Sequence, residues 1–252
     1  VLKLLKFYED RISETNLRDI FFHLGMIALA DKDWTEAQKR FFQSTMQDGK
    51  FVRGYLALAK SFQAQLDMDE SLKPGDNADA ESMSVQKAKR EQIMKSVLGS
   101  YKEAEALIAG TRSALNDEDF VAQWREAVSD LDSVKNDNPL NPSKLKTPVP
   151  SDLIREQRRM LVRRHAEVLF EIARAHHALD NVRDALLTME KACKLLPKDA
   201  GLLFYAAMLY EIDGHPEDAA KAYRKILRID PDHSVAKRNL ELLIEQNPEL
   251  EE

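Results

Sequence analysis

Six histidines and one cysteine are the side chains of this 252-residue chain best suited to metal binding or nucleophilic chemistry. The histidines are scattered through the sequence, and the only adjacent pair is His176 and His177. Neighbouring residues on a helix point about 100° apart, which does not suit one shared metal site. The sequence has no HExxH, no paired CxxC, no G-x-S-x-G and no phosphate-binding loop. We therefore expect no catalytic residue, no metal ligand, no cofactor and no enzymatic activity.

A run of arginines offers a different chemistry, the binding of anions. The run forms a positive stripe on one helix face, called here the basic stripe Arg155–Arg164. A nucleic acid or an anionic lipid could bind such a stripe. The chain has a net charge of −6, however, and no aromatic residues interleave with the arginines to stack on bases, so we do not expect nucleic-acid binding. The other interpretation is a surface stripe that pairs with the acidic segment Asp67–Glu81.

The elements that must position these residues are helices. The chain is 44% hydrophobic and 32% charged, which is enough for one sizeable body, and no alternating apolar runs indicate strands. No stretch approaches the roughly 20 apolar residues that a membrane span needs. Cys193 is the only cysteine, so an internal disulfide is excluded, and we expect it to be buried.

Two C-terminal stretches carry the same pattern one period apart. The pattern consists of large and small apolar residues at helical spacing, an aromatic position, and a closing proline. In the first stretch it occupies Leu169, Ile172, Ala173, His176, Ala185, Met189, Ala192 and Pro197. In the second it occupies Leu203, Ala206, Ala207, Tyr210, Ala219, Tyr223, Ile226 and Pro231.

This pattern resembles the tetratricopeptide repeat (TPR), a helix pair of about 34 residues. Small residues such as Ala173 and Ala207 would let two antiparallel helices approach closely. Asn181 and Gly214 suit the turn between the helices, where a left-handed backbone is common. The resemblance implies an all-α fold: a right-handed superhelix of antiparallel helix pairs, or TPR-like solenoid, with an irregular central helical insertion.

Weaker copies of the pattern divide the chain into three regions. Residues 1–66 are predicted to hold N-terminal TPR-like helices, beginning within an incomplete repeat. Residues 67–151 contain an acidic loop, a long helical stretch at 85–109, an amphipathic helix at 116–134 and a proline-rich crossover. Residues 152–252 are predicted to hold the C-terminal repeats and a capping helix.

The resemblance also implies a binding surface, because stacked helix pairs form an extended concave face. In the family, the second, fifth, ninth, twelfth and thirteenth positions of each unit commonly line it. Carried onto this sequence, the predicted groove residues are Phe22, Met26, Arg53, Phe170, Arg174, His177, Phe204, Met208 and Glu211. We expect a non-catalytic protein–protein interaction scaffold that binds a partner peptide or helix in a concave, partly apolar groove.

Three alternatives stay open at this point. The long helix from Asp152 or the central insertion could fill the groove from within. The basic stripe could make the chain a regulator that binds an anionic ligand. The incomplete N-terminal repeat could make it a self-associating assembly factor, or homo-oligomer. A single cysteine favours the cytoplasm, while a start at Val1 indicates a processed or excised form and leaves a removed signal or anchor open.

Overall fold

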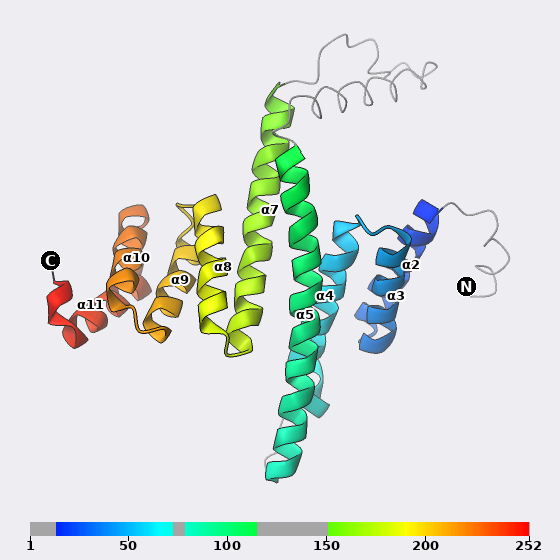
Figure 1. Cartoon of the computed structure of the whole chain (residues 1–252), viewed down its shortest axis with the longest axis horizontal. Helices are drawn as coiled ribbons and strands as arrows, with labels where there is room; N and C mark the ends of the chain where they lie inside the picture. The colour runs from blue at the N-terminus through cyan, green and yellow to red at the C-terminus, as the bar shows by residue number, and fades with distance from the viewer. Residues whose placement is uncertain (1–13, 73–78, 115–150, 252) are drawn as a thin grey trace.

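The computed structural model describes residues 14–72, 79–114 and 151–251 (Figure 1). The expected helix at 116–134, the proline-rich crossover and most of the incomplete first repeat lie outside these residues. Within them every regular element is a helix, as expected. The longer helices are α2 (Glu14–Ala30), α3 (Trp34–Gln47), α4 (Val52–Met68), α5 (Ala80–Ala114), α7 (Ser151–Ala178), α8 (Val182–Leu195), α9 (Ala200–Ile212), α10 (Pro216–Ile229) and α11 (Ser234–Gln246). Two short 3-10 helices, η1 (Glu70–Leu72) and η3 (Pro248–Leu250), follow α4 and α11.

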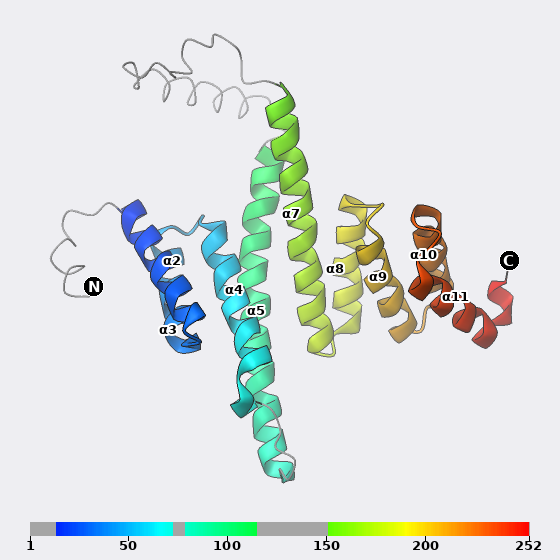
Figure 2. The same cartoon turned by 180° about the vertical axis from the view of Figure 1, so that it is seen from behind.

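The helices stack as antiparallel pairs in a solenoid. Among the described helices, each one from α3 to α10 packs against the described helix before it and the one after it. Figure 1 looks onto the second helices of the pairs, α3, α5, α8 and α10, and Figure 2 looks onto the first helices, α2, α4, α7, α9 and α11. The expected solenoid of helix pairs is therefore confirmed.

Small residues lie where the helices touch. Ala173, Ala185, Ala207 and Ala219 are all fully buried. At Gly25 the approach is closer still, because a Cβ atom there would lie 2.7 Å from the ring of Phe41. These contacts let the bulky side chains beside them close the core without voids.

The turn inside a helix pair uses the same backbone conformation three times. Lys32, Asp180 and Gly214 have φ angles of 59°, 60° and 76°, in the left-handed region. Each residue follows a first helix and lets the chain reverse. The prediction for Gly214 is confirmed, whereas Asn181 was the wrong choice: its φ is −90°, and the preceding Asp180 makes the turn.

The central part of the chain is built on two long helices. The stretch expected at 85–109 is α5, which runs from Ala80 to Ala114 and takes the second-helix place beside α4. Tyr101, Ala104 and Ile108 lie on its buried side. Its neighbour α7 runs in the opposite direction, and one end of each helix projects beyond the shorter ones (Figures 1 and 2).

This antiparallel arrangement corrects one expectation about the basic stripe Arg155–Arg164. The stripe lies at the start of α7, whereas the acidic segment leads into the start of α5, at the opposite end of the pair (Figure 1). The described residues of that segment therefore do not neutralise the stripe. One acidic residue on the same helix does pair with the stripe, since Glu156 Oε2 lies 3.7 Å from Arg159 Nη1.

Candidate binding groove

Three aromatic residues at the fifth position of their units connect successive first helices. Phe22 packs edge-on against Phe51 at the start of α4, with 5.4 Å between ring centroids, and the Arg53 guanidinium lies 5.0 Å from the Phe22 ring centre. Phe22 is only 8% exposed. Its assignment to an open groove is therefore wrong, because Phe41 and Phe51 enclose its ring.

The two C-terminal members of this set are half-buried. The Phe170 ring of α7 packs edge-on against the Tyr205 ring of α9, with 5.2 Å between ring centroids, and Arg174 extends over the Phe170 ring. Phe204 of α9 stacks on His233 at the start of α11 with 5.8 Å between ring centroids. Both rings keep part of their surface accessible while they join neighbouring units.

Polar side chains form a second set of links along the first-helix face. Gln63 of α4 donates a 3.0 Å hydrogen bond from Nε2 to Glu171 Oε2 of α7. His177 Nδ1 of α7 lies 3.0 Å from the Tyr205 hydroxyl of α9. In both links the twelfth position of one first helix meets the sixth position of the next.

The last link of this set passes through a tyrosine. The Tyr223 hydroxyl donates a short hydrogen bond to Glu211 of α9 and accepts one of 3.1 Å from Asn239 Nδ2 of α11. In the same way the Tyr101 hydroxyl of α5 donates a 2.9 Å hydrogen bond to Gln63 Oε1. Burial raises the pKa of both phenols, which keeps them protonated as donors.

These links surround a cavity of about 350 Å³ at the junction of α4, α5, α7 and α9. Its lining includes the predicted groove residues Arg174 and His177, which the structure brings together with Gln63 and Tyr205. Arg174 donates a 3.1 Å hydrogen bond to Glu171 and keeps 53% of its side chain exposed. The cavity therefore offers a guanidinium, an imidazole and a phenol to a bound group.

Other predicted groove residues lie away from this cavity. Met26 is 45% exposed on α2, and Arg53 is held over Phe22 at the start of α4. Met208 and Glu211 lie on α9, where Met208 is half-buried and Glu211 accepts the bond from Tyr223. The face thus has separate N-terminal and C-terminal parts, with α7 between them.

The predicted groove residues did not include Tyr205 and Arg90, which line the cavity, or Glu171, which bonds to Gln63 beside it. Glu171 and Tyr205 both stand at the sixth position of a first helix, so the period alone could have indicated them. Arg90 belongs to α5, whose register the repeat pattern does not give. It reaches the cavity because α5 crosses the end of α4, where Arg90 Nη1 donates a 3.3 Å hydrogen bond to the Leu66 carbonyl.

The long helix from Asp152 does not fill the groove. In the structure it is α7, the first helix of the third pair, and Arg174, His177 and Ala178 make it one wall of the cavity. Residues 115–150 of the insertion lie outside the described part of the chain.

Among the described residues, no group of three or more His, Cys, Asp or Glu side chains could hold a metal ion. None of the described helices is both long enough and apolar enough to cross a membrane.

Comparison with known proteins agrees with this architecture. Residues 200–233 match the family model of the tetratricopeptide repeat. Two crystal structures of MamA have similar folds. In the first the TM-score is 0.52 and the identity 14%, over 91% of this chain and 81% of MamA. In the second the TM-score is 0.51 and the identity 14%, over 90% of this chain and 86% of MamA. A search of curated proteins gives no match.

Residues 200–233 therefore belong to the tetratricopeptide repeat family, and the described part of the chain has an all-α solenoid fold. Proteins of this architecture generally act as non-catalytic scaffolds, and they bind other proteins on the extended surface that the stacked repeats create. The fold supports a general role in protein interaction here.

Proposed function

We propose that this protein binds a segment of a partner protein along its first-helix face, centred on the cavity between α4, α7 and α9. The observation that carries the proposal is the grouping of Arg174, His177 and Tyr205 around one cavity beside the half-buried ring of Phe170. Peptide sites combine apolar contact with a few convergent polar groups that fix direction, and this cavity supplies both.

The polar groups of the cavity suit a polypeptide ligand in particular. Arg174 shares its carboxylate partner Glu171 with Gln63, and more than half of its side chain faces solvent. It can therefore donate to a backbone carbonyl or a carboxylate without giving up Glu171. Burial raises the pKa of Tyr205, so its hydroxyl remains protonated and can hydrogen-bond to a ligand.

Site-specific photo-cross-linking tests the proposal. A photoreactive amino acid replaces Arg174 in one protein and Lys191 in a matched control. Lys191 is an exposed residue of α8, a second helix on the other side of the stack. In an extract of the source cells, we expect a discrete adduct from position 174 and none from position 191.

A variant pair then connects the adduct to the cavity. Tyr205→Ala should weaken the binding of the recovered partner by about tenfold or more, as for an aromatic anchor at the centre of an interface. Tyr55→Ala on α4 is the matched control, because Tyr55 is also half-buried but does not line the cavity. An adduct that forms equally from position 191, or an affinity that does not respond to Tyr205→Ala, contradicts the proposal.

A further inference from the structure

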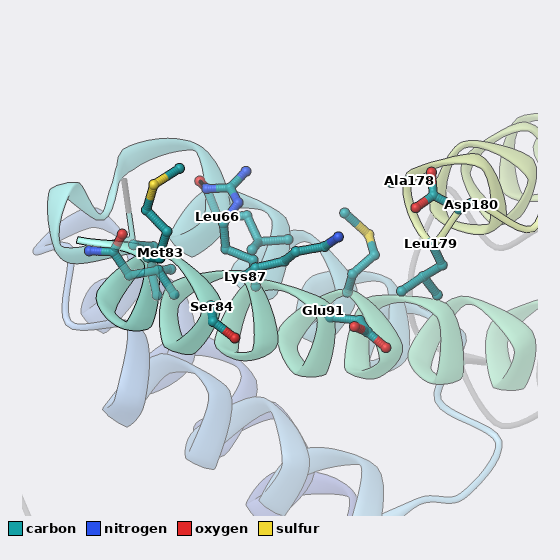
Figure 3. Close-up of a pocket in the computed structure, with 13 residues that line it drawn as sticks. Leu66, Met83, Ser84, Lys87, Glu91, Ala178, Leu179 and Asp180 are labelled. Carbon is teal, nitrogen blue, oxygen red and sulfur yellow. Dashed lines mark hydrogen bonds between the residues drawn. The ribbon is translucent and has the colours of Figure 1, made fainter. Parts of the chain in front are cut away.

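A second and larger cavity opens beside the groove. It measures about 690 Å³ and lies between the end of α4, η1, the start of α5 and the turn from α7 to α8. Figure 3 shows α5 running along it from Met83 to Glu91, with Leu179 and Asp180 at its far end. Leu66, Arg90, Met94 and Ala178 line both cavities, so the larger one continues the groove. It exists because α5 begins well beyond the helices that it packs against (Figure 1).

The walls of this larger cavity are mainly apolar. Their large side chains are Leu66, Leu72, Met83, Met94 and Leu179. Leu66 and Leu72 are buried and form its inner wall, whereas Met83 is 51% exposed at its edge. Flexible methionine side chains adapt to different apolar ligands. A cavity of this volume lies within the range of ligand sites and accepts one or two large apolar side chains.

Two cations of α5 stand in this apolar wall. Lys87 forms no ion pair with any residue in the described part of the chain, and Arg90 makes only its bond to the Leu66 carbonyl there. Glu91, which also lines the cavity, lies 2.8 Å from Lys95 instead. The acidic residue Asp180 lies beside Leu179 at one end of the cavity, Met83 lies at the other, and Lys87 lies between them (Figure 3). Lys95 and, to a smaller extent, Lys87 lower the pKa of Glu91, so Glu91 offsets part of this positive charge. Lys87 and Arg90 still supply N–H donors that an acidic group of a ligand can use.

We propose that this cavity is a specificity pocket for a polypeptide segment that places a large apolar side chain among Leu66, Leu72 and Met83 and an acidic side chain against Lys87 and Arg90. The inference rests on the proposed function, because the same segment continues into the groove at Arg174. It adds the chemistry that the partner must carry: an apolar residue followed or preceded closely by Asp or Glu.

A phage-displayed library of random heptapeptides is the probe. We expect selection on the full chain to enrich peptides with a Leu, Ile, Met or Phe next to an acidic residue. Selection on Lys87→Glu should replace the acidic preference by a basic one. Lys89→Glu is the matched control, because Lys89 is exposed on the same helix and does not line the cavity; it should leave the preference as it is.

A blocking variant tests whether the peptides enter the cavity. Ala80 lines the larger cavity only, so Ala80→Trp should reduce the affinity of a selected synthetic peptide at least tenfold, whereas Ala88→Trp on the same helix should not. Circular dichroism verifies that each variant is folded. If selected peptides bind Ala80→Trp and Lys87→Glu as tightly as the native protein, the pocket proposal is overturned. If the same peptides no longer bind Arg174→Glu, the groove proposal is still supported. If no peptides are enriched, both proposals fail.

Discussion

Gln63 and Glu171 are 108 residues apart in the sequence, yet their side chains share a 3.0 Å hydrogen bond. The bond joins α4 to α7 across the whole central insertion. Gln63 also accepts from Tyr101 of α5, so one amide side chain connects three helices. His177 and Tyr205 repeat the same relationship between α7 and α9. The N-terminal and C-terminal repeats are therefore parts of one continuous stack.

Gln63→Ala should destabilise the protein by about 1–3 kcal/mol, because it leaves the buried Tyr101 hydroxyl without its acceptor. Urea unfolding followed by circular dichroism measures the change. Tyr101→Phe removes the hydroxyl itself, so adding Gln63→Ala to Tyr101→Phe should cost clearly less than Gln63→Ala alone. Gln92→Ala, an exposed change on α5, is the control and should be neutral. Additive losses in the double variant would show that the two side chains are not coupled.

Ala207→Leu should destabilise the protein by about 1–3 kcal/mol through overpacking. Ala207 has no exposed surface and lies in the core cluster with Ala219 and Tyr223, where no space remains for three further carbon atoms. A thermal melt measures the loss. Ala30→Leu at the exposed end of α2 is the matched control, with no loss expected. An unchanged melting temperature for Ala207→Leu would refute the helix contact.

His176→Phe should make stability less dependent on pH. Burial lowers the pKa of His176, nearby Lys102 lowers it further, and Asp184 opposes them. As the pH falls below about 6.5, the unfolded chain binds a proton at this histidine more readily than the native protein does. His176 therefore costs stability from that pH downward and nothing above it.

The measurement for this histidine is urea unfolding at pH 8 and at pH 5.5. The gain in stability of His176→Phe over the native sequence should be larger at pH 5.5 than at pH 8, because phenylalanine does not titrate. It also removes the buried Nδ1 atom that has no hydrogen-bond partner. His215→Phe, at an exposed histidine, is the control. An equal gain at both pH values would exclude the titration of His176 as the cause.

Lys32→Gly should stabilise the protein by about 0.5–1 kcal/mol, because glycine adopts a left-handed φ without the steric cost that lysine bears. Lys39→Gly, in the middle of α3, is the opposite case and should destabilise by about 1 kcal/mol. Both changes are read from urea unfolding curves. A loss of stability with Lys32→Gly would contradict the assigned turn conformation.

Cys193 should react slowly with iodoacetamide in the native protein. Burial raises the pKa of its thiol from 9.0 to about 11, which lowers the thiolate fraction at pH 8 by about 100-fold. Mass spectrometry follows the alkylation over time. The same reaction in urea is the control and should regain the rate of a free thiol. Equal rates in both conditions would contradict a half-buried, protonated Cys193.

The sequence alone determined the repeat, because the features that define it are local. The spacing of Ala207, Ala219, Tyr223 and Pro231 requires a helix pair whose small residues touch, and residues 200–233 match the family on that basis. The same periodicity indicated Arg174 and His177 on the groove face. It also identified α5 as a helix, although not which of its residues face α4.

Tertiary structure decided how the repeats meet. Phe22 is buried because Phe41 of α3 and Phe51, the N-cap of α4, close over it. The larger cavity depends on where α5 starts relative to the turn that contains Leu179. Helical periodicity fixes which side of a helix is apolar, but the distance between residues far apart in sequence follows from how the helices pack.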